Sequence, residues 1–172
     1  MVAPALIISI CALFFTILSF WWLNWRRGKL YVSNPRLFAA LGKNDLLLIE
    51  IPLIFFNNGA APIIIENLKL NVHDEEEVKI LDYIAILDKI GTDEGRTFAS
   101  QFAVRGRDCV KLICEFQRRP GGFIFKAKSY KVDLMGKLSH KEKWKKLTSF
   151  DIKINEIALS KIGNCLLTYD NF

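Results

Sequence analysis

Two histidines and four cysteines are the side chains with which this 172-residue chain could ligate a metal or attack a substrate. His73 and His140 stand far apart, and no cysteine pair has the C-x-x-C spacing that zinc sites commonly use. A Ser-His-Asp site depends on spatial proximity, so the sequence leaves it open without favouring it. No glycine-rich motif for a dinucleotide or a phosphate occurs. We therefore predict no catalytic residues, no metal ligands and no cofactor.

The cysteines indicate a reducing environment rather than a disulfide framework. Cys109 and Cys114 are an odd number of positions apart, so in a strand they point to opposite faces. With Cys165 they make an odd number of thiols after the apolar N-terminus, where Cys11 lies, and cannot all pair within one domain. We interpret these three as small buried side chains in a reducing compartment.

Two charged runs are candidates for binding. The acidic run at 74–77 lacks the spaced Asp or Asn and the glycine of a calcium loop, so we interpret it as a solvated turn. A basic run surrounds one tryptophan, and we name its densest part the loop patch: Lys141, Lys143, Trp144, Lys145 and Lys146. Charge with an aromatic anchor suits anionic lipid, an acidic protein or RNA. The alternative is a solvated loop with Trp144 packed on the core.

The apolar N-terminus predicts one transmembrane helix. Residues 2–25 contain no Asp, Glu, Lys or Arg and would form a helix about 36 Å long, against about 30 Å of bilayer hydrocarbon. A cleaved signal peptide would begin with basic residues and end in a small-residue cleavage site, and neither is present. The run ends in residues typical of a membrane interface: Trp21, Trp22, Trp25, Arg26, Arg27 and Lys29. We predict that residues 1–27 form this helix and its anchor.

The basic residues that follow the apolar run also indicate an orientation. Three of them lie within four positions, whereas only the terminal amine precedes the run. By the positive-inside rule we expect a single-pass protein of the plasma (inner) membrane with its C-terminal domain in the cytoplasm.

Small residues at spacings of four and three lie along one face of the predicted helix: Ala5, Ser9, Ala12, Thr16 and Ser19. Such a face lets membrane helices pack closely, so one hypothesis is self-association or docking on another membrane helix. The alternative is that common residues coincide there by chance.

The sequence of residues 28–172 predicts a mostly β domain. Alternating apolar residues predict strands around 46–56, 63–72, 98–104, 110–117, 123–134 and 148–154. A first strand is expected at 30–33, and 79–88 suits either a strand or a helix. Pro52 predicts an edge or a bulge, and a change of phase predicts a bulge near Lys128. We expect an immunoglobulin-like antiparallel β-sandwich of seven to nine strands, preceded by the transmembrane α-helix.

The short linker predicts that the domain sits against the membrane. If successive strands reverse direction, the loops at 57–62, 89–96 and 118–122 lie near the membrane, and the acidic run and the loop patch lie away from it. On this count Arg118 and Arg119 are the expected lipid contacts.

Two stretches resemble small, uncharacterised bacterial membrane proteins. They are Leu53-Ile54-Phe55-Phe56-Asn57-Asn58-Gly59-Ala60-Ala61-Pro62, with Glu66-Asn67-Leu68-Lys69-Leu70, and Phe102-Ala103-Val104-Arg105-Gly106-Arg107. The resemblance implies one membrane helix joined to a β-sandwich, with no assigned activity and no functional residues to transfer.

Three functions remain open. The first is a membrane-anchored, non-enzymatic interaction or scaffold module that presents the β-sandwich to a protein partner or to a second copy of itself. The second is a sensor of an anionic lipid surface or of envelope stress. The third is an enzyme with an unrecognised site. The net charge of +6 favours anionic lipid or an acidic protein over nucleic acid as a partner.

Overall fold

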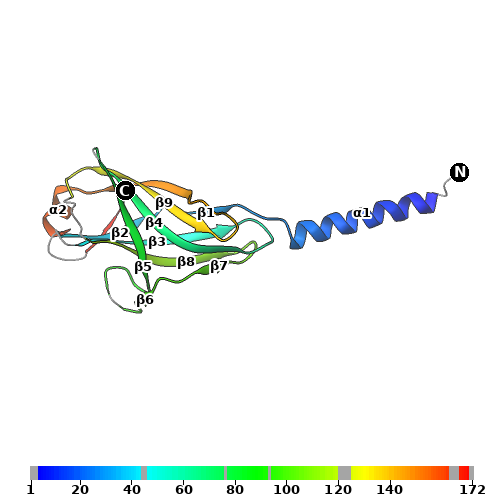
Figure 1. Cartoon of the computed structure of the whole chain (residues 1–172), viewed down its shortest axis with the longest axis horizontal. Coiled ribbons are helices and arrows are strands. Elements are labelled where there is room, and N and C mark those ends of the chain that lie inside the picture. The colour runs from blue at the N-terminus through cyan, green and yellow to red at the C-terminus, as the bar shows by residue number, and fades with distance from the viewer. Residues whose placement is uncertain are drawn as a thin grey trace.

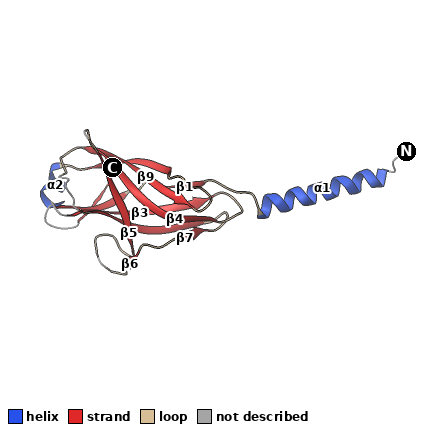
Figure 2. Ribbon diagram, in the orientation of Figure 1, coloured by secondary structure: helices blue, strands red, loops and turns tan. Residues whose placement is uncertain are grey.

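The computed structural model describes residues 4–43, 46–75, 77–92, 94–119, 125–162 and 167–170. A long helix, α1 (Pro4–Asn24), leads into an antiparallel β domain that also carries a short helix, α2 (Glu156–Ile162) (Figures 1 and 2). The strands are β1 (Leu30–Val32), β2 (Leu37–Lys43), β3 (Leu46–Asn57), β4 (Ile63–His73), β5 (Val78–Leu87), β6 (Thr97–Phe98), β7 (Phe102–Val104), β8 (Cys109–Arg118), β9 (Ser129–Leu138), β10 (Lys145–Lys153) and β11 (Leu167–Asp170).

The helix α1 projects away from the β domain, as Figure 1 shows. None of its residues is buried, and its large apolar side chains are all exposed. Its length and its mean hydropathy of 2.3 are sufficient for it to cross a membrane. The prediction of one apolar N-terminal helix is therefore confirmed, with bounds slightly inside those expected.

The described strands form one hydrogen-bonded sheet. Along the main path the order is β10-β9-β4-β5-β8-β3-β2-β11, and β1, β6 and β7 pair beside it. All these pairings are antiparallel. Alternate side chains of the long strands point to one face, and these make up a single core cluster. The core lies inside the curve of the sheet.

The sheet curls until its ends approach each other, giving a near-barrel (Figure 2). β1 pairs with the end of β3, so that Leu30 lies opposite Asn57. The Thr148 hydroxyl on β10 lies 3.1 Å from the side-chain oxygen of Asn34, which follows β1. This contact joins the β10 edge to the segment between β1 and β2.

The expected mostly β, antiparallel fold is confirmed, with more strands than the seven to nine expected. The described chain has eleven, because β2 and β11 were not expected and the stretch 98–104 forms two strands, β6 and β7. The pairing of β5 with β8 joins all strands into one sheet, whereas an immunoglobulin-like sandwich keeps two sheets separate.

Local predictions had mixed outcomes. The inward-facing sets of β8 and β10 are as expected, and 79–88 is a strand. Pro52 pairs with β8 on one side and lies between the β1 and β2 segments on the other, which agrees with an edge position. No bulge occurs at Lys128, because β9 begins only at Ser129. Most of the expected loop at 118–122 lies outside the described residues, because residues 120–124 are not described.

The stretch 98–104 is not one strand, and this corrects the loop placement. β6 pairs antiparallel with β5 and β7 antiparallel with β4, and β4 and β5 are themselves antiparallel. The chain therefore reverses between β6 and β7, and Phe98 is 83% exposed rather than buried. Because this reversal was not expected, each later loop lies at the opposite end of the domain from the end predicted for it.

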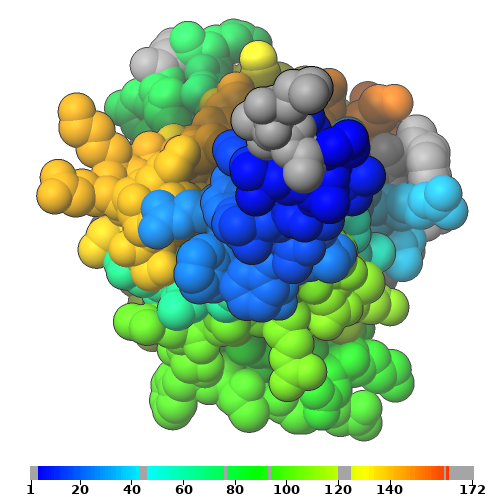
Figure 3. Space-filling view, turned by 90° about the vertical axis from the view of Figure 1, so that its right-hand side faces the viewer, coloured from blue at the N-terminus to red at the C-terminus, as the bar shows by residue number. Residues whose placement is uncertain are grey.

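We call the end of the domain at which α1 joins the helix-proximal end. Arg118 pairs with Leu47 at the start of β3, far from Asn57 at its helix-proximal end, so the expected placement of Arg118 and Arg119 near the helix is wrong. Conversely, β9 ends beside the beginning of β4, which brings the loop patch to the helix-proximal end instead of the far end. Figure 3 looks onto this end and shows the β9–β10 loop, in orange-yellow, beside the base of the helix.

Candidate functional site

Two turns at the helix-proximal end contact the linker between α1 and β1, residues 25–29. We call these two turns, residues 57–61 and residues 105–108, the collar. The carbonyl oxygen of Arg26 accepts hydrogen bonds from the backbone nitrogens of Ala60, at 2.8 Å, and Ala61, at 3.3 Å. The Lys29 nitrogen donates to the Asn58 side-chain oxygen at 2.7 Å, and the Asn58 nitrogen donates to the Lys29 carbonyl at 3.3 Å. The linker is thus bound along its length.

Glycines make the close approach within the collar sterically feasible. A Cβ atom on Gly28 would lie 2.0 Å from the backbone nitrogen of Gly59, and one on Gly59 would lie 2.0 Å from the nitrogen of Gly28. A Cβ on Gly106 would lie 1.8 Å from the Ala60 carbonyl oxygen. Any larger residue at these positions would force the two turns and the linker apart.

Arg107 connects the collar to the helix itself. Its backbone adopts a positive φ of 56°, its nitrogen donates to the Gly59 carbonyl at 2.8 Å, and its guanidinium donates to the Trp22 carbonyl at 3.2 Å. Asn57 is fully buried and supports the turn by donating to the carbonyls of Ala61 and Val104. The collar overlaps both sequence stretches on which the resemblance to bacterial membrane proteins was based, at residues 57–61 and 105–107.

The expected interface residues divide into two groups. Arg26 is half-buried, because its guanidinium donates to the Asn58 carbonyl at 2.6 Å and lies 4.3 Å from the centre of the Trp22 ring. The others are exposed at the end of α1 and just beyond it: Trp21, Trp22, Trp25, Arg27 and Lys29. Arg26 is bound to the collar, whereas Arg27 is exposed.

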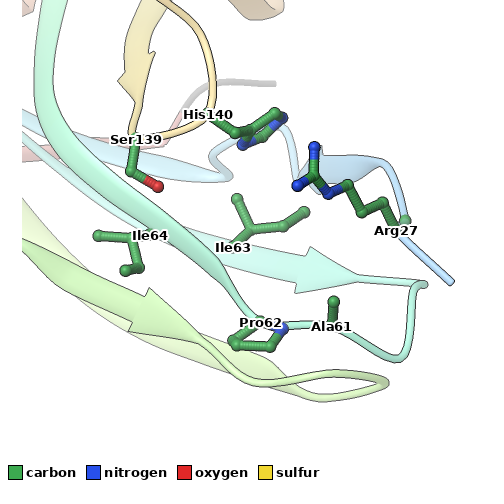
Figure 4. A pocket seen from close by; sticks show the side chains of 8 residues that line it. Arg27, Ala61, Pro62, Ile63, Ile64, Ser139 and His140 are labelled. Atoms are coloured by element: carbon green, nitrogen blue, oxygen red, sulfur yellow. The ribbon is translucent and has the colours of Figure 1, made fainter. Parts of the chain in front are cut away.

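A pocket of about 220 Å³ lies beside the collar, and we call it the junction pocket. Its lining comes from the linker, the start of β4 and the β9–β10 loop: Arg27, Gly28, Ala61, Pro62, Ile63, Ile64, Ser139 and His140. Figure 4 shows the Arg27 guanidinium reaching toward the His140 ring above Ile63. The pocket combines a polar, basic rim with an apolar floor.

The charged side chains that act on His140 in the junction pocket are all basic. Burial lowers the pKa of His140 below its usual value of 6.5, and the positive charges of Lys141, Arg27 and Lys145 lower it further. No carboxylate is among the lining residues. Neutral His140 can then donate or accept a hydrogen bond, while Arg27 supplies a permanent positive charge.

The loop patch is only partly available to a partner. Lys141, Lys143 and Lys145 are exposed, but the Lys146 ammonium lies 3.1 Å from the Asp133 carboxylate. Trp144 is 36% exposed and carries the Lys69 ammonium 4.2 Å from its ring centre, so it packs on the outer surface of the sheet and not in the core.

Asp133 is the centre of a hydrogen-bond network beside the loop patch. It accepts hydrogen bonds from Ser149 at 2.6 Å and Lys146 at 3.1 Å, and it contacts His73 at 3.1 Å. Burial raises the pKa of Asp133, but these three contacts outweigh burial and lower the pKa to about 2. Asp133 therefore remains charged in the folded protein across the physiological range.

A buried acidic pair on the outer face of the sheet was not predicted. Glu50 and Glu115 lie opposite each other on β3 and β8, only 1% and 2% exposed. Arg96 binds Glu115 through two hydrogen bonds of 3.0 and 2.9 Å, and the Gly91 nitrogen donates to Glu50 at 2.6 Å. The loop after β5 covers the pair. Glu50 is the one charged residue in an apolar stretch, which was the available signal.

The small-residue face of α1 and the cysteines are the remaining candidates, and their contacts point to no reactive or metal-binding site among the described residues. The hydroxyls of Ser9 and Thr16 on the small-residue face each donate to the carbonyl four residues earlier, at 2.8 Å. Cys114 is buried as expected, but Cys109 is exposed, and Cys165 lies outside the described chain. Within the described ranges, no group of three or more His, Cys, Asp or Glu could hold a metal ion.

Comparison with known proteins leaves the chain unassigned. No family model matches it, and no curated protein matches it. Among solved structures it is similar to a crystal structure of a protein from Archaeoglobus fulgidus, with 8% identity and a TM-score of 0.41, covering 82% of this chain and 98% of that chain. A TM-score this low carries no argument about fold or function.

Proposed function

We propose that the chain is a membrane-anchored, non-enzymatic interaction module. In this proposal α1 spans the plasma membrane once and holds the β domain at the cytoplasmic surface, where the domain presents its outer face to a protein partner or to a second copy. The β domain is then a variant of the immunoglobulin-like sandwich in which β5 and β8 bridge the two layers.

The collar is the observation that carries this proposal. If location alone mattered, a flexible tether between helix and domain would serve. Instead, hydrogen bonds from residues 58–61 hold the linker, and Arg107 reaches the last turn of α1. A fixed attachment determines which surface of the domain faces the membrane and which faces outward, and this matters for a module that binds a partner in one orientation.

The test is isolation of the tagged full-length protein from membranes after chemical cross-linking. We expect the same partner, or further copies of the chain, to be recovered each time. A matched variant carries a short Gly-Ser insertion after Trp25, which preserves anchor and domain but uncouples the collar from the helix. This variant should remain in the membrane and lose the partner.

Repeated recovery of the full-length chain alone would contradict the proposal. Full recovery of the partner with the insertion variant would contradict the role of the collar. Recovery of the full-length chain in the aqueous fraction would contradict the membrane anchor.

A second candidate function, a sensor of the anionic lipid surface, is favoured by the position of the loop patch. Lys141, Lys143 and Lys145 lie at the helix-proximal end, where negatively charged headgroups would attract them. Hydrogen exchange of residues 139–146 can test it with the full-length protein in nanodiscs. Exchange should be slower in anionic than in neutral lipid, and high salt should remove the difference. Equal exchange in both lipids would exclude this function.

A further inference from the structure

We propose that the junction pocket binds the phosphate group of a membrane phospholipid headgroup, with Arg27 as its principal contact and Ser139 and His140 beside it. This inference rests on the proposed membrane location of the chain and goes beyond it by naming a ligand and a site. A phosphate free in solution has the same chemistry, so the experiment below separates the two sources.

The position of the pocket is the first argument. Arg27 follows the last tryptophan of the predicted interface belt by two residues, and α1 ends at Asn24. If α1 spans a bilayer, the tryptophans lie at headgroup depth and Arg27 lies at the level of the phosphates. The collar holds Gly28 against Gly59, so the pocket cannot swing away from the membrane without breaking contacts.

The chemistry of the rim is the second argument. A guanidinium is planar and can donate two parallel hydrogen bonds to a phosphate, and hydroxyl and imidazole groups can donate further ones. The Arg27 guanidinium, the Ser139 hydroxyl and the His140 ring all belong to this one pocket. Below them Pro62, Ile63 and Ile64 form an apolar floor, which suits the glycerol and first methylenes of a lipid.

The availability of Arg27 is the third argument. Among the residues that the structure describes, Arg27 has no ion-pair partner, whereas Arg26 is bound into the collar and Arg96 is bound to Glu115. Lys141 and Lys145 add positive charge close to His140. An anion entering the pocket would therefore meet an unpaired guanidinium in a positive field, with no lining carboxylate to repel it.

The pocket is also formed before any ligand arrives. The Ser139 nitrogen donates to the Ile64 carbonyl at 3.1 Å, and the Lys141 nitrogen donates to the Leu138 carbonyl at 2.8 Å. The first bond holds the β9–β10 loop against β4 and the second closes the turn of that loop, while the collar fixes Arg27 on the other side. Because both walls are held in place, binding would require little ordering of the chain.

The experiment uses the full-length protein in nanodiscs that mix phosphatidylcholine with phosphatidylglycerol, and native mass spectrometry measures the lipid retained on the released protein. We expect wild type to retain phosphatidylglycerol about tenfold over phosphatidylcholine, because the positive charges of Arg27, Lys141 and Lys145 repel the choline cation beside the phosphate. The substitutions Arg27→Gln and His140→Gln should reduce this preference, the first to within about twofold of parity. The matched control is Lys143→Gln, which removes an exposed charge from the same loop outside the pocket and should leave the preference intact.

Two results would contradict lipid binding in the junction pocket. One is an unchanged lipid preference in Arg27→Gln. The other is an equal loss in Lys143→Gln, which would mean that diffuse surface charge attracts the lipid. Thermal unfolding checks that each variant is folded. If Arg27→Gln is not, Arg27→Lys keeps the charge without the bidentate geometry and should give an intermediate preference; a wild-type preference there would contradict the guanidinium contact.

A second arm identifies the source of the phosphate. The His140 imidazole resonance, assigned by comparison with His140→Gln, is followed in uncharged detergent while inorganic phosphate or short-chain phosphatidylglycerol is added. We expect the lipid to shift the resonance at much lower concentration than phosphate. A shift with inorganic phosphate alone would overturn the lipid assignment. Failure to recover a protein partner would leave these lipid measurements unchanged, so the two proposals can fail separately.

Discussion

At the scale of single residues, the sheet tolerates two carboxylates directly opposite each other because a cation is supplied by a distant loop. Glu50 and Glu115 are cross-strand neighbours, and like charges in this relation destabilise a sheet. Arg96 binds Glu115 in a bidentate geometry, and Gln117 donates to the same carboxylate. The covering loop thus neutralises charge on the strands beneath it.

Removing Arg96 should therefore be costly. With Arg96→Ala, Glu115 stays buried beside Glu50 without its guanidinium, and we expect a loss of about 2 kcal/mol in the free energy of unfolding. This is less than for a fully buried pair, because the Arg96 side chain is 34% exposed. Denaturant unfolding of the full-length protein in detergent measures it. The control is Lys89→Ala, from an exposed pair, which should change stability by no more than about 0.5 kcal/mol. Equal effects would contradict the role of Arg96.

Asp133 should make stability depend on acid pH. Its folded-state pKa of about 2 is below the ordinary value of 3.8, so its contribution is fully present above the ordinary value and is lost as pH falls toward about 2. Unfolding measured between about pH 5 and pH 2 should show a fall in stability that is shallower in Asp133→Asn. The matched control is Asp82→Asn, which removes an exposed carboxylate from β5 and should leave the slope near that of wild type. An unchanged slope in Asp133→Asn would contradict the network.

At the scale of elements, alternation in the sequence predicted most long strands but not their partners. β8 and β10 bury the expected sides because a period of two follows directly from strand geometry. The reversal between β6 and β7 has no such periodic signal, since the two pieces have two and three residues. Pairing register is set by the whole sheet, so neither the Glu50–Glu115 pair nor the placement of Arg27 beside His140 followed from local pattern.

The collar is the element-scale feature most open to test. In Gly59→Ala the new Cβ would lie 2.0 Å from the Gly28 nitrogen, so the linker must leave the turn. We expect limited trypsin digestion of the full-length protein to cut after Arg26 and Arg27 about tenfold faster, because the bound linker becomes accessible. Ala61→Gly alters the same turn without adding an atom and should be cut at nearly the wild-type rate. Unchanged cleavage in Gly59→Ala would contradict a tightly held linker.

At the scale of the whole molecule, charge and exposure are arranged around the junction between helix and domain. The exposed lysines of the loop patch and the junction pocket lie at the helix-proximal end, whereas the acidic Asp74 and Glu75 lie at the far end of β4 and are bound by Lys128. This polarity agrees with a domain placed next to an anionic surface. The far position of the acidic run was predicted from the sequence, whereas the missed reversal hid the position of the loop patch.

The side of the membrane on which the domain lies can be measured through Cys109. This thiol is exposed at the helix-proximal end of β8, whereas Cys114 is buried and Cys11 lies in α1. In a Cys165→Ser background, a membrane-impermeant maleimide should label the protein only after the cells are permeabilised, because we propose a cytoplasmic domain. Adding Cys109→Ser should abolish that labelling, which identifies the reacting thiol. Labelling of Cys109 in intact cells would reverse the proposed orientation, and the lipid bound in the junction pocket would then belong to the outer leaflet.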